Sequence, residues 1–100
     1  MAKKLIHVLV VDDHPIVRRG LCAEINLDPE MQVVGEAKNG VEAVQLARLF
    51  RPDVILMDAV MPEMDGIDAT AEIVKHDPLA KVLILTSFTE DERLLNALKA

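Results

Sequence analysis

The sequence predicts an α/β domain in which a mostly parallel β-sheet carries helices on both faces. Short aliphatic runs of strand length recur along the 100 residues, and segments with helical spacing of apolar residues separate them. Such regular alternation favours right-handed crossovers and parallel strands. The composition agrees, because 51% of the residues are hydrophobic but only two are aromatic, so the core must be aliphatic, as in buried parallel sheets.

The strands are predicted from apolar runs. These runs are Leu5–Val11, Val33–Ala37, Asp53–Met57 and Lys81–Thr86. Three of them are continuous rather than alternating, which is typical of strands covered on both faces.

The helices are predicted from apolar residues that share one helical face. The shared faces comprise Val17, Leu21 and Ile25; Ala43, Ala47 and Phe50; Ile67, Ala71 and Val74; and Leu94 and Leu98. Together with the strands they predict the order βαβαβαβα in a single domain.

Local signals mark where these helices begin and end. The start signals are Pro15 in a first turn, Asn39 before Glu42, Thr89 before Glu92, and Asp65-Gly66. The stop signals are Asp28-Pro29, Arg51-Pro52 and Asp77-Pro78, because proline disfavours a helical conformation of the residue before it.

Composition also limits the possible functions. A net charge of −6 argues against direct binding of nucleic acid, which needs a surplus of Lys and Arg. The single cysteine, Cys22, cannot form an internal disulfide. Because no leader-like start and no apolar run of about 18 residues occurs, we expect a cytoplasmic protein that is not inserted in a membrane.

Polar residues follow three of the predicted strands. Asp12 and Asp13 end the first, Asp58 follows the third, and Thr86-Ser87 ends the fourth. The carboxyl ends of parallel strands meet at one edge of a sheet, where ligands bind. Three carboxylates there would repel each other, and a divalent cation would relieve the repulsion. Hard oxygen ligands favour Mg²⁺.

A carboxylate beside bound Mg²⁺ can act as a nucleophile toward a phosphoryl group and form an aspartyl phosphate. Asp58 is the best candidate, because the third strand is central and "AVMPEMDG" can form an open loop after it. The hydroxyl of Thr86 or Ser87 could donate to a phosphate oxygen. Taken singly, each Asp could instead cap a helix or lie in a loop, but their joint placement favours a site.

The segments "VLVVDDHPIVRRGL", "PDVILMDAVMPEMDG" and "KVLILTSF" together closely resemble the receiver domain of two-component response regulators. The segment "DDHPIVRRGL" is most similar to the subfamily that joins a receiver to a C-terminal helix-turn-helix domain. The resemblance implies a flavodoxin-like doubly wound sheet with strand order 2-1-3-4. It also implies a sensor histidine kinase as partner, with DNA contacted only through the helix-turn-helix domain, which this chain lacks.

The resemblance also implies roles for single residues. Asp58 matches the phosphoacceptor, charged from a phosphohistidine on the kinase. Asp12 and Asp13 match the acidic pair that positions Mg²⁺, Asp13 as the direct ligand and Asp12 through water. Val60 would offer its backbone carbonyl to the metal.

Four further positions match the motif. Thr86 corresponds to the switch hydroxyl that moves toward the phosphate, and the small Ser87 leaves the phosphate room. Pro62 and Gly66 correspond to the loop that shapes the pocket.

The sequence departs from the family pattern after Ala100. A fifth strand, a fifth helix, a lysine that contacts the phosphate and an aromatic switch residue do not occur in it. We therefore expect residues 1–100 to be a truncated receiver domain, from a fragment or a shortened regulator. The fourth strand would then be an apolar edge, so we expect a homodimer or a domain-exchanged oligomer.

Other conspicuous residues are interpreted structurally. His14 is expected to be a loop residue near a helix start, because Mg²⁺ prefers oxygen. Cys22 is expected to fill space, and the soft thioethers of Met57, Met61 and Met64 are expected to pack rather than bind metal. Phe88 is expected to border the mouth of the pocket and to affect access of water.

Three functions compete. The first is a signalling receiver in which phosphorylation of Asp58 adds about −1.5 to −2 charges and changes the surface of the fourth helix, with no turnover of an external substrate. The second is a Mg²⁺-dependent phosphatase, but such enzymes carry two Asp separated by one residue, whereas Asp12 and Asp13 are adjacent. The third is a flavodoxin-like dimerisation module with an inactive acidic pocket.

Overall fold

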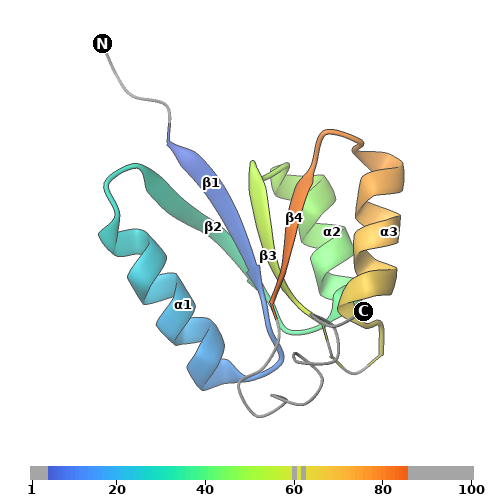
Figure 1. The fold of residues 1–100 in the computed structure, drawn as a ribbon, viewed down its shortest axis with the longest axis horizontal. Helices are drawn as coiled ribbons and strands as arrows, with labels where there is room; N and C mark the ends of the chain where they lie inside the picture. The colour runs from blue at the N-terminus through green and yellow to red at the C-terminus, as the bar shows by residue number, and fades with distance from the viewer. Residues whose placement is uncertain (1–4, 60, 62, 86–100) are drawn as a thin grey trace, which may run out of the picture.

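Strands and helices alternate along the chain. The computed structural model describes residues 5–59, 61 and 63–85. In this part of the chain the elements are β1 (Ile6–Val11), α1 (Pro15–Leu27), β2 (Met31–Ala37), α2 (Gly40–Phe50), β3 (Val54–Asp58), α3 (Gly66–His76) and β4 (Lys81–Leu85) (Figure 1). The strands form one parallel sheet in the order β2-β1-β3-β4. The predicted fold class and strand order are confirmed.

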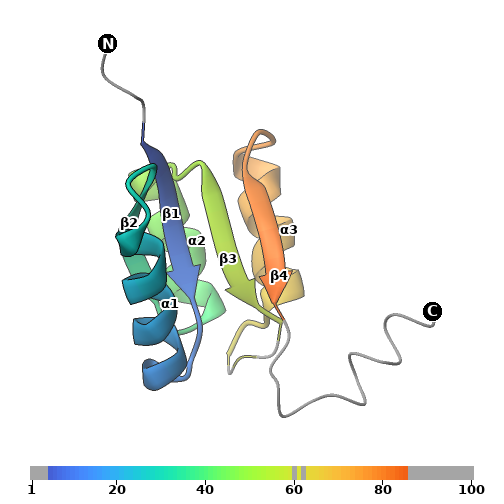
Figure 2. The same ribbon diagram turned by 60° about the vertical axis from the view of Figure 1, so that its left-hand side comes forward.

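Helices cover both faces of the sheet. Helix α1 lies on one face, and α2 and α3 lie side by side on the other (Figures 1 and 2). Successive residues of β1 alternate between the two sides: Leu9 and Val11 belong to the core under α2 and α3, and Val8 and Val10 to the core under α1. All four are at most 3% exposed, which explains why this strand is a continuous apolar run.

The predicted helix signals act as expected wherever the structure describes them. Helix α1 has Pro15 as its first residue, and it is followed by Asp28. The Asn39 side chain accepts a hydrogen bond of 2.8 Å from the Glu42 N–H, and the Asp65 side chain accepts one of 2.9 Å from Asp68. The predicted fourth helix, with Thr89, Glu92, Leu94 and Leu98, lies outside the described residues.

Strand boundaries shift by one or two residues from the predicted ones. The clearest case is β3, which runs from Val54 to Asp58 instead of from Asp53 to Met57. The Asp53 side chain accepts a 2.8 Å hydrogen bond from the backbone N–H of His7, so Asp53 fastens the start of the strand to β1. Strand β4 ends at Leu85, and Thr86 lies outside the described residues.

The predicted apolar face of α3 is wrong. Ile67 and Val74 are 68% and 38% exposed, whereas Gly66, Ala69 and Ile73 are buried. The reason is the close packing of Gly66: a Cβ there would lie 2.3 Å from the Asp58 carbonyl oxygen. This contact sets the rotation of the helix, so the residues three and seven positions after Gly66 face the sheet.

The predicted faces of the other two helices are correct in part. In α1, Ile25 is buried but Val17 is 49% exposed, and Cys22 completes the buried surface. In α2, Ala47 is buried as predicted, and the half-exposed Phe50 covers Gly35 with its ring.

Strand β4 is the most exposed strand of the described sheet. Leu83 and Ile84 are 55% and 39% exposed, and β4 pairs with β3 but with no other strand among the described residues. Within residues 5–85, as far as the structure describes them, the expectation of coverage on both faces therefore holds for β1 and not for β4.

The orientation of α3 can be tested with a pair of isoleucine substitutions. Ile73→Ala should lower the free energy of unfolding by about 2–4 kcal/mol, because it opens a cavity in the core. Ile67→Ala, on the exposed side of the same helix, should change it by less than about 0.5 kcal/mol. Urea denaturation followed by circular dichroism measures both, and equal losses would contradict this orientation of the helix.

Candidate functional site

The carboxyl ends of β1 and β3 bring two aspartates together. The strands pair in register, with Val11 opposite Met57, so the adjacent residues Asp12 and Asp58 lie at the same edge of the sheet. Both are buried, with 7% and 6% of their surface exposed. Asp13 follows directly and is partly buried. The structure thus brings these three carboxylates together at one edge of the sheet, as the sequence predicts.

Hydrogen bonds hold Asp12 in place. Its backbone N–H donates to the Ala37 carbonyl at 3.0 Å, which extends the pairing with β2 by one residue. Its backbone carbonyl accepts a 2.8 Å bond from the Arg18 guanidinium, and the same guanidinium donates to Glu36 at 3.1 Å. Arg18, on α1, thus ties the end of β1 to β2.

His14 stands against all three carboxylates, which the sequence interpretation missed. Its Nδ1 lies 2.9 Å from Asp12 Oδ1, 3.2 Å from Asp13 Oδ1 and 3.9 Å from Asp58 Oδ2. The hydrogen bond with Asp12 and the charge of Asp13 raise the pKa of His14 above its usual 6.5. The ring therefore serves as a positive counter-charge for the cluster when protonated, rather than being only a loop residue.

One carboxylate oxygen of the cluster has no hydrogen bond. Asp13 Oδ1 is the single buried side-chain oxygen or nitrogen in the described part of the chain without such a partner, and Nδ1 of the His14 ring lies 3.2 Å from it. A buried unsatisfied anionic oxygen is costly, and a metal ion is a common way to satisfy it. The cluster therefore fits a cation at Asp13.

The spacing of the cluster also fits a small divalent cation. Asp12, Asp13, His14 and Asp58 offer ligand atoms that all lie within 4.8 Å of one another. Two direct ligands of one Mg²⁺, each at about 2.1 Å, can be at most about 4.2 Å apart. Mg²⁺ usually keeps several waters, so a water in place of one direct ligand accommodates the wider separations.

Two glycines fix the loop that follows β3. Gly66 donates to the Ala59 carbonyl at 3.0 Å, and Gly40 donates to the Met64 carbonyl at 3.1 Å. A Cβ on Gly40 would lie 2.2 Å from that same carbonyl oxygen. Gly66 was expected to shape this loop, whereas Gly40 was missed, because its role depends on a contact between α2 and a loop far along the chain.

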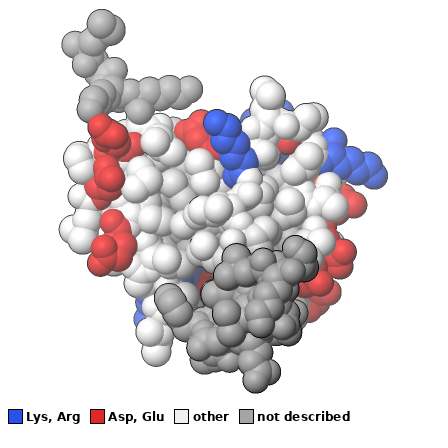
Figure 3. All heavy atoms as spheres, viewed as in Figure 1, with Lys and Arg blue, Asp and Glu red and all other residues white. Residues whose placement is uncertain are grey.

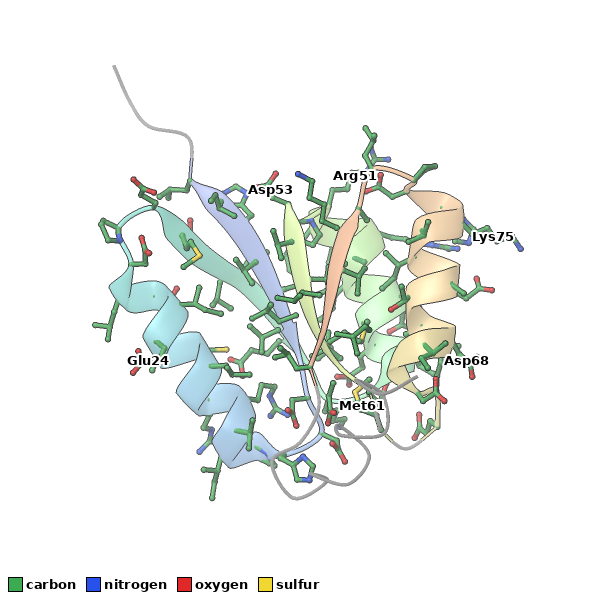
Figure 4. All side chains as sticks on the ribbon, viewed as in Figure 1. Glu24, Arg51, Asp53, Met61, Asp68 and Lys75 are labelled. Carbon is green, nitrogen blue, oxygen red and sulfur yellow. The ribbon has the colours of Figure 1, made fainter. Side chains whose placement is uncertain are left out.

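The remaining predicted residues divide into two groups. The methionines pack as predicted: Met57 and Met61 are at most 7% exposed and Met64 packs against them, with Met61 directed inward in Figure 4. Cys22 is buried, and burial raises the pKa of its thiol. The second group lies outside the described residues and consists of Val60, Pro62, Thr86, Ser87 and Phe88.

The family model described as the response regulator receiver domain matches residues 8–100. The chain belongs to this family. The predicted family is therefore confirmed, and with it the expectation of a signalling module of two-component systems.

Curated relatives are regulators about twice as long as this chain. It is 46% identical over 96 residues to the transcriptional regulatory protein LiaR of Bacillus subtilis, covering 96% of this chain and 46% of LiaR. It is 47% identical over 95 residues to the response regulator protein VraR of Staphylococcus aureus, covering 95% and 46%. The chain thus spans about half the length of these relatives.

Solved structures agree with the fold. The response regulator domain of Thermotoga maritima CheB superimposes with a TM-score of 0.82 at 42% identity, covering 96% of this chain and 72% of that one. A two-component response regulator of the LuxR family from Aurantimonas gives a TM-score of 0.81 at 38% identity, covering 96% of this chain and 69% of that one.

No helix in the described ranges is long and apolar enough to cross a membrane.

The contact between His14 and the carboxylates predicts a pH dependence. Because the pKa of His14 is raised in the folded state, its contact with the carboxylates stabilises the fold fully at pH values below the unfolded-state pKa of about 6.5. This stabilisation is lost as the pH rises through the folded-state pKa of His14. In metal-free protein, NMR titration of the ring should give a lower pKa in Asp12→Asn. Asp53→Asn, at the other end of the sheet, should leave it unchanged, and equal shifts in both variants would contradict the contact.

The close approach of Gly66 to β3 predicts opposite effects of two glycine substitutions. Gly66→Ala should lower the free energy of unfolding by about 1–3 kcal/mol, because its Cβ would overlap the Asp58 carbonyl. Gly20→Ala should raise it by about 0.5–1 kcal/mol, since Gly20 lies within α1 with nothing within 4 Å of its Cβ position. Thermal denaturation distinguishes the two signs, and a stabilising Gly66→Ala would refute the packing.

Proposed function

We propose that this receiver domain accepts a phosphoryl group on Asp58 from a phosphohistidine of a sensor histidine kinase, with Mg²⁺ as cofactor. The observation that supports the proposal is the gathering of Asp12, Asp13 and Asp58 within one cluster of ligand atoms. The membership of the chain in the receiver family makes phosphoryl transfer the chemistry to test first.

In the proposed reaction an Asp58 carboxylate oxygen attacks phosphorus. A new O–P bond forms as the P–N bond to the histidine of the kinase breaks, and that histidine keeps the electron pair of the broken bond. The Asp58 side chain is only 7% exposed, and its backbone is fixed by the pairing of β3 with β1 and β4. A nucleophile held at a fixed position reduces the entropy that the transfer must overcome.

The residues around Asp58 suggest how the cation would be held. Asp13 is proposed as a direct ligand, because its Oδ1 lacks a hydrogen bond. Asp12 is proposed to act through water, because its Oδ1 already accepts from the His14 backbone N–H at 2.8 Å and lies 2.9 Å from the ring. The Val60 carbonyl is proposed as a further ligand. Bound Mg²⁺ would neutralise charge on the transferring phosphoryl oxygens.

The response to phosphorylation is proposed to involve Thr86 and Ser87, whose hydroxyl groups would approach the new phosphate. The phosphate would shift the balance between two packings of the domain. LiaR is named as a transcriptional regulatory protein. We propose that phosphorylation here likewise controls a DNA-binding domain beyond residues 1–100, and that no external substrate is turned over.

Association of two copies is proposed to accompany this function. The half-exposed Leu83 and Ile84 of β4 provide apolar surface that a second copy would cover, as a homodimer or by exchange of elements. An alternative function, a flavodoxin-like dimerisation module with an inactive acidic pocket, would use the same surface without phosphorylation.

Phosphorylation distinguishes these functions. Incubation with acetyl phosphate and Mg²⁺ should add the mass of one phosphoryl group, as measured by intact mass spectrometry. The gain should disappear in Asp58→Asn, because the nucleophile is lost, and should fall at least about tenfold in rate in Asp13→Asn, because charge-assisted ligation is weakened.

Asp53→Asn is the matched control, since it removes a strand-end carboxylate at the opposite edge of the sheet and should phosphorylate normally. No mass gain in the unsubstituted chain would favour the inactive pocket. A gain that persists in Asp58→Asn would reject Asp58 as the acceptor.

A further inference from the structure

A cavity lies at the end of the sheet opposite the aspartates. It has a volume of about 310 Å³ and opens between the C-terminal ends of α2 and α3. Its floor is apolar and includes the buried residues Ala47, Ile55 and Ile73, all at most 8% exposed, together with Val44. The volume and the apolar floor match those of small-molecule sites.

The rim of this cavity carries a local excess of positive charge on an acidic protein. It is formed by Arg48, Arg51, His76 and Asp77, while the chain as a whole carries −6. Arg51 lies at the upper end of the molecule in Figure 4, and Figure 3 shows both basic and acidic atoms toward that end. The Asp77 carboxylate is engaged in its own turn, where it accepts from Leu79 N–H at 3.2 Å.

The ends of the two helices oppose this positive charge. Each helix C-terminus carries about half a negative charge, and the last carbonyl groups are partly satisfied, since Arg51 and Asp77 donate their N–H groups to Ala47 and Ile73. With Asp77 included, the charges of the rim and the two helix ends roughly cancel, so the attraction for an anion lies in the guanidinium donors of Arg48 and Arg51 and not in a net positive charge.

One contact across the rim can be replaced by an anion. The Arg48 guanidinium contacts Nε2 of His76, so this contact joins α2 to α3. Arginine can only donate, so His76 can act only as the acceptor in this contact. Glu72 also faces this ring, at 3.7 Å. A carboxylate accepts from guanidinium more strongly than a neutral imidazole does, and would bind Arg48 better than His76 can.

We propose that this cavity binds a small organic monocarboxylate, with its apolar body against Ile55 and Ile73 and its carboxylate at Arg48 and Arg51. The site would make the domain responsive to a second input beyond the proposed phosphorylation. It shares no residue with the acidic cluster, so its test is independent of that function.

The probe for this site is 4-phenylbutyrate, compared with the neutral 4-phenylbutan-1-ol. Titration of the full chain, followed by amide chemical shifts, should give saturable changes at Ala47 and Ile73. The alcohol should bind at least about tenfold more weakly, because a charge-assisted hydrogen bond is lost. Equal affinity for acid and alcohol, or changes that do not saturate, would overturn the proposal.

Three substitutions locate the binding. Arg48→Gln should weaken affinity for 4-phenylbutyrate about tenfold, whereas Arg19→Gln, an exposed arginine on α1, should not change it. Ala80→Leu, which places a larger side chain at the lining of the cavity, should abolish binding while the protein remains folded by its amide spectrum. Unchanged affinity in Arg48→Gln or in folded Ala80→Leu would reject the site.

Discussion

The register between β1 and β3 is the constraint on which the rest of the structure depends. It pairs Val11 with Met57, and a slip of one residue would exchange the side chains that fit under α1 with those that fit under α2 and α3. Burial of side chains such as Leu9, Ile55 and Met57 contributes about 1.5–3 kcal/mol each. Repulsion between two carboxylates about 4 Å apart near a protein surface costs about 4 kcal/mol before any counter-charge. Core packing therefore fixes the register and places Asp12 beside Asp58 despite their charges.

Nearby positive groups then offset part of the repulsion between the carboxylates of the cluster. His14 lies within 4 Å of a carboxylate oxygen of all three aspartates, and Arg18 binds the Asp12 backbone at 2.8 Å. These groups do not complete the site, because Asp13 Oδ1 still lacks a hydrogen bond. The structure thus combines a partly neutralised acidic cluster with one carboxylate oxygen that a cation would satisfy.

The residues that could be predicted from the sequence are those whose position depends only on the order and direction of the strands. Asp12 and Asp58 are found together because the ends of parallel strands must meet at one edge, whatever the details of packing. The face of α3 that includes Ile67 was predicted wrongly, because apolar spacing does not reveal how a helix is rotated, and the close packing of Gly66 decides that rotation. His14 was missed for a related reason: its role depends on a turn that directs the ring back over the carboxylates.

Helix α3 extends from the acidic cluster to the cavity between α2 and α3. Its first residue, Gly66, is hydrogen-bonded to Ala59, directly after Asp58, and near its other end Ile73 and His76 line the cavity. Eleven residues form a rod about 16 Å long, and buried packing deforms little along such a rod. A shift of the backbone after Asp58 would therefore move the cavity wall as well. If ligands of the proposed cavity site and of the acidic cluster each favour a particular position of this helix, each would change the affinity of the other site, because coupling between binding sites is reciprocal.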